Sequence, residues 1–201
     1  MNQELQGKVV VRLKRRFVAF LMVVLLLLAA VGCIGPERSP KEVVLLYVDA
    51  LRGDVEGLSK YDPEAVPEEG FWAESLEGQD IAFTPEQVDA YVLASQAALK
   101  RSRVTAVGET INGGTAVVKL EILQVDFVNT VTALAEAIDW SGKTSEDVNS
   151  MIADLMIRGL NEAPLTDRLV TQEVTLTKVN GLWVLDEASA VPLVNSMILF
   201  Q

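Results

Sequence analysis

The first 33 residues of the chain combine a basic segment, a long apolar run and a cysteine, in that order. The basic residues are Lys8, Arg12, Lys14, Arg15 and Arg16. An uncharged apolar run from Phe17 to Val31 follows them, and Gly32 and Cys33 come next. A cationic segment stays on the cytoplasmic side of a membrane while the apolar run enters the bilayer. We therefore expect the rest of the chain to be delivered to the extracytoplasmic side.

The residues before Cys33 resemble the lipobox of bacterial lipoproteins, in which small or apolar residues precede a thiol that receives diacylglycerol. Ala30, Val31 and Gly32 occupy those positions. The resemblance implies a signal peptide over residues 1–32, palmitate-type acylation of Cys33 and a lipidated tether over residues 33–38. It also implies a location at the cell membrane, where bilayer lipid holds the chain on the extracytoplasmic face.

An uncleaved single-pass anchor is the alternative for the same segment. A helix that spans a bilayer needs about 20 residues, and the apolar run from Phe17 to Val31 has 15. Counting on to Gly35 gives 19 residues, so length leaves this alternative open. The cysteine count favours lipidation, because an exported domain with one thiol cannot form an internal disulfide.

From Cys33 onward the chain has the length of one domain and an acidic composition. These 169 residues carry 12 Lys and Arg against 27 Asp and Glu, a net charge of −15. We expect a single domain over residues 39–201. Nucleic acid is excluded as a partner, because binding it requires a basic surface. An acidic surface also repels anionic headgroups, so we expect the lipid anchor to hold the protein at the membrane.

The expected domain opens with a capping box, SPKE at residues 39–42, with proline at the first helical position. The apolar stripe behind it predicts a helix. Gly53 is expected to end this helix and Asp54 to cap a short second helix over residues 55–61. With Arg52 these two residues also spell an integrin-type adhesion motif, but capping roles at a corner between helices explain them better.

Three more helices are predicted along the chain. The motif TPEQ at residues 84–87 begins a helix that runs to about residue 101. Thr144 caps a helix over residues 146–160, and a helix over residues 128–139 precedes it. We expect these last two to form a helical insertion over about residues 128–165.

Two segments in which apolar residues alternate predict β-hairpins on either side of that insertion. Residues 104–122 alternate around Asn112-Gly113-Gly114, and their second strand is expected to extend to Phe127. This places Gln124 and Asp126 near a strand end, where side chains can reach a pocket. Residues 169–185 alternate around Asn180-Gly181, a type I′ turn signal.

Two further expectations concern the end of the chain. Trp183 follows the Asn180-Gly181 turn on an alternating strand, so we expect it in the core with Val179 or Leu185 as neighbours. Residues 191–200 are expected to close the chain as a short helix or an apolar tail.

Residues 62–80 predict a long acidic loop with an apolar pair, Phe71 and Trp72, at its centre. Loops of this length are often functional or disordered, so this one is a candidate binding rim. Its carboxylates do not have EF-hand spacing, and we expect a solvated loop with no metal site. The carboxylates in question are Glu68, Glu69, Glu74, Glu77 and Asp80.

Together, helices followed by hairpins on either side of a helical insertion predict an α+β fold with an antiparallel sheet. The opening residues 39–54 and the closing residues 174–186 (VTLTKVNGLWVLD) resemble the ends of nuclear transport factor 2-like domains, also called SnoaL-like or cystatin-like. Small lipoproteins of Gram-positive bacteria often carry this pairing. The resemblance implies a cone, in which N-terminal helices pack on a curved antiparallel sheet and enclose a pocket.

The pocket implied by this resemblance leaves two functional classes open. An isomerase or hydrolase of this fold would need a pocket carboxylate and a hydrogen-bond donor, and Asp126 with Tyr91 or Tyr47 could fill those roles. The chain has no histidine, which excludes His-dependent triads and most zinc sites, so we assign no catalytic residue and no cofactor. We favour a binding or interaction module, with Trp72 and Trp140 as contacts for a small molecule, peptide or envelope protein.

Overall fold

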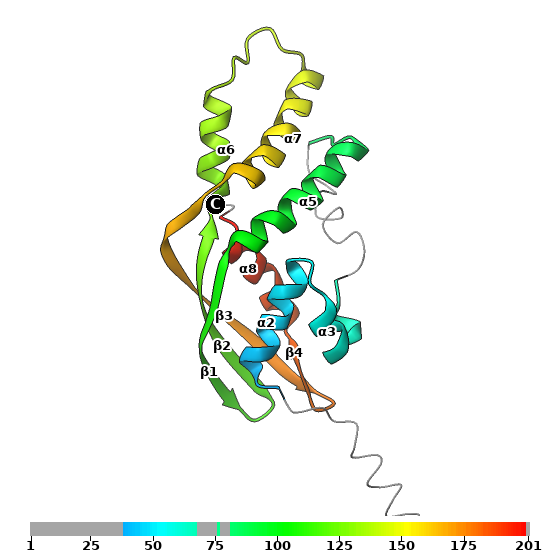
Figure 1. Ribbon diagram of the computed structural model, residues 1–201, viewed down its shortest axis with the longest axis vertical. Helices are drawn as coiled ribbons and strands as arrows, with labels where there is room; N and C mark the ends of the chain where they lie inside the picture. Colours follow the sequence, from blue (N-terminus) through cyan, green and yellow to red (C-terminus); the bar gives the residue numbers. More distant parts are fainter. Residues whose placement is uncertain (1–37, 68–75, 77–80, 200–201) are drawn as a thin grey trace, which may run out of the picture. The chain divides into compact units, whose positions relative to one another are not determined.

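One open antiparallel sheet of four strands organises the part of the chain that the structure describes. The computed structural model describes residues 38–67, 76 and 81–199, and Figure 1 shows helices packed against the sheet. The strand order is β1-β2-β3-β4. The strands are β1 (Arg103–Asn112), β2 (Thr115–Val125), β3 (Leu165–Val179) and β4 (Leu182–Leu185). The helices are α2 (Pro40–Leu51), α3 (Glu56–Tyr61), α5 (Pro85–Arg101), α6 (Phe127–Glu136), α7 (Ser145–Glu162) and α8 (Glu187–Met197), with a short 3-10 turn, η1 (Pro63–Ala65). An α+β architecture with an antiparallel sheet is thereby confirmed.

The three predicted capping boxes start helices where the sequence places them. The side chains of Ser39, Thr84 and Thr144 each accept a hydrogen bond from the backbone N–H three residues on, and the backbone N–H of each donates to the side chain of that same residue. At Ser39 the two bonds measure 3.3 Å and 2.8 Å. These boxes satisfy backbone donors that have no partner inside the helix.

Gly53 ends α2 as predicted, but the start of α3 differs by one residue from the prediction. Gly53 has φ +89°, a left-handed conformation that favours glycine. The N-cap of α3 is Val55, and the carboxylate of Asp54 accepts a hydrogen bond from the Glu56 N–H at 3.4 Å. Asp54 therefore supports the helix start from outside the cap position.

Both predicted hairpins form, and their boundaries differ from the predictions. Asn180 and Gly181 both have positive φ, as a type I′ turn requires. Strand β2 ends at Val125 instead of Phe127, because Phe127 already belongs to α6. Strand β3 begins four residues earlier than predicted and pairs with β2 as far as Leu165. Strand β1 contains an irregularity between Ala106 and Gly108 that the alternation did not predict.

The core lies between one face of the sheet and the helices. Alternate residues of β2 are at most 1% exposed, and α2, α5 and α8 contact this strand. These residues are Ala116, Val118, Leu120 and Ile122. Trp183 is buried at 4% exposure, which confirms its predicted place in the core. Of its two predicted neighbours, Leu185 shares its face of β4, whereas Val179 lies on the opposite face and is 47% exposed.

Helices α6 and α7 lie between β2 and β3 in the chain and pack against each other, and α7 also packs against α5. Figure 1 shows their connection at the end of the domain opposite the hairpin turns. Helix α8 begins at Glu187, earlier than predicted, and runs through Pro192. After it, Ile198 forms a parallel bridge with Val125 of β2. Among residues 38–67, 76 and 81–199, none of the helices has the length and hydropathy of a membrane span.

Candidate functional site

The structure places Tyr47, a predicted pocket residue, beside the outer edge of β4. Its hydroxyl accepts a hydrogen bond from the Leu185 N–H at 3.3 Å. The hydroxyl of Tyr61 accepts from the Trp183 N–H at 2.7 Å and donates to the Trp183 carbonyl at 3.2 Å. Trp183 and Leu185 alternate along the strand, so these two hydroxyls satisfy backbone groups that point away from β3. No sequence pattern indicated this role of Tyr61.

Tyr91, the second candidate donor, lies on the buried face of α5. Its side chain is 6% exposed and hydrogen-bonds to Ser95 on the next helical turn. The ring of Phe83 packs edge-on against it, with ring centroids 5.7 Å apart. This packing fixes the tyrosine in the core of the helix-covered face.

Burial raises the pKa of each of the chain's three tyrosines above the ordinary value of 10.0. The folded protein therefore keeps phenolic protons that the unfolded chain releases near pH 10. The stability that these tyrosines contribute is fully present below that pH, and it is lost as the pH rises further. We expect tyrosinate absorbance and the loss of helical circular dichroism to develop together above pH 10. Tyrosinate that forms at pH 10 while the dichroism stays constant would contradict this prediction.

Asp126, the candidate carboxylate, lies at the junction where β2 ends and α6 begins. Its carboxylate accepts a hydrogen bond from the Asn129 side-chain amide at 2.7 Å, and it is partly exposed. Its backbone carbonyl accepts from the Thr130 hydroxyl at 2.7 Å, and its N–H donates to the Pro164 carbonyl at 2.8 Å. The neighbouring Gln124 is 8% exposed. Through these contacts, Asp126 connects the end of β2 to the start of α6.

Trp140 lies just beyond α6, where its indole closes the end of the helix. Its Nε1–H donates to the Ala135 carbonyl at 3.0 Å, and the ring is partly buried. The indole thus satisfies one of the carbonyls that have no partner inside the helix. Trp72, Phe71, the five loop carboxylates and Cys33 lie outside the described residues. The described candidates have separate sets of partners: Tyr47 at β4, Tyr91 on α5, Asp126 at the start of α6 and Trp140 at its end.

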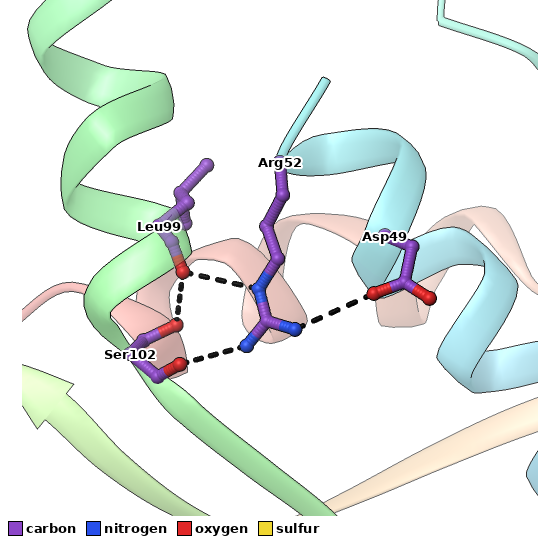
Figure 2. A network of polar contacts seen from close by, with 4 residues as sticks. All are labelled: Asp49, Arg52, Leu99 and Ser102. Carbon is purple, nitrogen blue, oxygen red and sulfur yellow. Dashed lines mark hydrogen bonds and ion pairs between the residues drawn. The ribbon is translucent and has the colours of Figure 1, made fainter. Parts of the chain in front are cut away.

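Two arginines, Arg52 and Arg101, link the ends of helices through contacts that the sequence did not predict. Figure 2 shows the guanidinium of Arg52 between α2 and the end of α5. Its Nε donates to the Leu99 carbonyl at 3.1 Å, and its Nη2 donates to the Ser102 carbonyl at 2.7 Å. Its Nη1 lies 3.4 Å from the Asp49 carboxylate. The guanidinium of Arg52 is therefore engaged within the fold, which supports the capping interpretation of residues 52–54.

Arg101 makes a similar link between α5 and the end of α7. It lies in the last turn of α5, and its Nη2 donates to the carbonyls of Leu160 and Ala163 at the end of α7. In both cases a cation meets the end of a helix where the macrodipole is negative. The two arginines thus connect α2 to α5 and α5 to α7.

The described interior is apolar, and its polar side chains are uncharged. The buried polar residues are Ser95, Ser102, Gln124, Ser189 and Ser196. Several have structural hydrogen bonds: Ser102 donates to the Leu99 carbonyl at 2.7 Å, and Ser189 accepts from the Thr175 N–H at 3.0 Å. Within the described ranges, every buried side-chain nitrogen or oxygen has a partner, and no group of three Asp, Glu, Cys or His could hold a metal.

Comparison with known proteins relates the chain to a solved structure by its fold. Neither a protein-family model nor a curated protein matches the sequence. The structure is similar to a crystal structure from Bacillus subtilis subsp. subtilis str. 168, described as a putative lipoprotein (YcdA), with a TM-score of 0.52 and 19% identity. The match covers 79% of this chain and 55% of that chain. The chain thus spans about half the length of that structure, and the likeness is one of fold.

Proposed function

We propose that this chain is an exported lipoprotein that acts as a binding or interaction module. Acylated Cys33 holds its folded domain, residues 39–201, at the extracytoplasmic face of the cell membrane. The observation that carries the proposal is the position of the chain's only cysteine, which lies directly behind the basic and apolar segments and six residues before the cap at Ser39. Each buried methylene of an acyl chain contributes about 0.8 kcal/mol, and more than one chain gives durable anchoring.

The structural relative supports this proposal independently of the signal motif. That protein is described as a putative lipoprotein, and its fold resembles that of the region following Cys33 in this chain. We also propose that the domain is a nuclear transport factor 2-like cone with an insertion over about residues 128–165. The order of a helical start, a hairpin, two helices and a second hairpin supports this finer assignment.

The character of the interior supports binding over catalysis. The isomerase or hydrolase alternative would need a carboxylate shielded from water beside a hydrogen-bond donor. Asp126, its best candidate, is partly exposed and already accepts a hydrogen bond from Asn129. A module that binds a small molecule, peptide or envelope protein needs no such shielded carboxylate.

The anchor is tested by labelling cells with a palmitate analogue. We expect label on the wild type and on Ser39→Ala, which leaves the cysteine in place, but none on Cys33→Ala. Equal labelling of the wild type and Cys33→Ala would contradict the proposal. Label on neither protein would favour the uncleaved single-pass anchor.

The binding role is tested by native mass spectrometry of the full acylated chain, released from its own membranes in mild detergent. A species heavier than the acylated chain by a reproducible mass would identify the ligand or partner. A bare acylated monomer, together with an empty result from crosslinking in intact cells, would contradict a binding or interaction role.

A further inference from the structure

We propose that the anchored domain rests on the bilayer with one particular end, the end of the sheet that carries both hairpin turns. This inference depends on the proposed acylation of Cys33. The surface, called the turn end below, consists of the turns at residues 113–114 and 180–181 together with Ile111, Val179 and Leu182. Its partner is the headgroup region of a lipid bilayer.

Exposed apolar side chains gather at the turn end. Ile111 is 53% exposed, Val179 is 47% exposed and Leu182 is 37% exposed. Val179 and Leu182 are cross-strand partners on either side of one turn, and Ile111 comes shortly before the other turn. The two turns lie side by side, because the Lys178 N–H donates to the Gly114 carbonyl at 2.7 Å. Val179 and Leu182 project from the face of the sheet that points away from the core, and Ile111, which pairs with the buried Ala116, projects from the other face at the same end.

The glycines of the turns face open space. A Cβ atom built on Gly113, Gly114 or Gly181 would meet no other atom within 4 Å. The described part of the fold therefore leaves the tips of both turns free to approach another surface.

The tether joins the domain at this same end. Helix α2 begins beside β1, where the Lys41 N–H donates to the Glu109 carboxylate at 3.1 Å, two residues before Ile111. Figure 1 shows the start of α2 toward the end that carries both turns, and the α6–α7 connection at the opposite end. Six residues, from Ile34 to Ser39, separate Cys33 from α2, and they span at most about 20 Å when extended. Acyl chains on Cys33 therefore bring the turn end close to the bilayer.

The charges at the turn end suit a headgroup layer. Lys41 lies at the start of α2, and Arg38 is close enough to Tyr61 to oppose the rise of its pKa. The ammonium of Lys178, also at this end, lies 5.3 Å from the centroid of the Trp183 ring. The carboxylates of Glu42 and Glu109 accept hydrogen bonds from backbone N–H groups at this end. Long cationic side chains can reach phosphates while apolar side chains enter the boundary with the acyl region.

A single reporter thiol tests this orientation. Acylation consumes the Cys33 thiol, so a cysteine introduced elsewhere is the one reactive thiol of the mature chain. Val179→Cys places it at the turn end, and Leu169→Cys is a matched control. Both positions lie on the same face of β3, at 47% and 59% exposure. They are ten residues apart, or about 33 Å along the strand.

The full acylated chain, labelled with an environment-sensitive fluorophore, is reconstituted into phosphatidylcholine and phosphatidylglycerol vesicles that contain headgroup spin-labelled lipid. We expect quenching at position 179 to exceed that at position 169 by at least about fivefold, because contact quenching does not reach across about 33 Å. Asn112→Cys, at the other turn, should behave like Val179→Cys. Equal quenching at positions 169, 179 and 112 would overturn the orientation. Palmitate label on the same sample shows whether the anchor itself is present, so failure of the proposed function is distinguished from failure of this inference.

Discussion

Replacing Arg52 with methionine is expected to lower the free energy of unfolding by about 2 kcal/mol, because the variant leaves two carbonyls without their charged donor. The guanidinium donates to the carbonyls of Leu99 and Ser102 at the end of α5, and Ser102 is 3% exposed. Methionine keeps most of the side-chain volume and removes the hydrogen bonds. Denaturant unfolding followed by circular dichroism measures the difference.

The matched control for Arg52→Met is Lys60→Met. Lys60 forms an ion pair with Glu56 in which both side chains are more than 70% exposed. Exposed pairs of this kind contribute about 0–1 kcal/mol. If the two variants lose the same small amount of stability, the contacts of Arg52 do not hold α2 against α5 as described.

Replacing Gly159 with alanine is expected to destabilise the packing of α7 on α6 by about 1–3 kcal/mol through overpacking. A Cβ at position 159 would lie 2.3 Å from Cγ2 of Val131 and 3.2 Å from the ring of Phe127. Valine in a helix has one strongly preferred rotamer, so Val131 cannot easily turn aside. Alanine would otherwise stabilise an exposed helical position relative to glycine by about 1 kcal/mol. Thermal unfolding therefore distinguishes the two effects: overpacking lowers the stability of the variant, whereas helix propensity alone would raise it.

A double-mutant cycle with Val131→Ala tests the cause. Removing the valine methyl groups should restore part of the stability lost by Gly159→Ala, because the two residues share one contact. If the two losses are additive, or if Gly159→Ala stabilises the protein, α6 and α7 do not approach as closely as the structure shows.

Local sequence signals predicted the starts of helices and the positions of turns. The boxes at Ser39, Thr84 and Thr144 act within four residues, and the Asn180-Gly181 pair suits positive φ at both positions. Such features depend on neighbours along the chain, so a pattern of residue types is enough to find them. The alternation of β2 also located the core face of the sheet.

Features that depend on distant residues did not show in the sequence. The first residues of β3 are held by β2, with Leu165 paired to Val125 across 40 positions of the chain. The closing segment was predicted from residue 191 as a short helix or an apolar tail, yet α8 begins at Glu187. The Ser189 hydroxyl in its first turn accepts a hydrogen bond from the Thr175 N–H. Tertiary contacts of this kind override local preferences.

The candidate site residues also divide into those that local residue types pointed to and those that depend on distant contacts. Residue type drew attention to Tyr47 and to Asp126 near a strand end, and the structure gives them contacts with Leu185 and Asn129. The contacts of Arg52 and Arg101 were not predicted, because their acceptors are backbone carbonyls on other helices, which no residue type marks. The loop around Trp72 lies outside the described residues, so its role as a binding rim stays a prediction.

The intact mass of the protein purified from its own membranes tests the central claim most directly. The account predicts a mature chain that begins at Cys33 and carries the added mass of a diacylglyceryl group on the thiol. An unmodified chain that still begins at Met1 would contradict it.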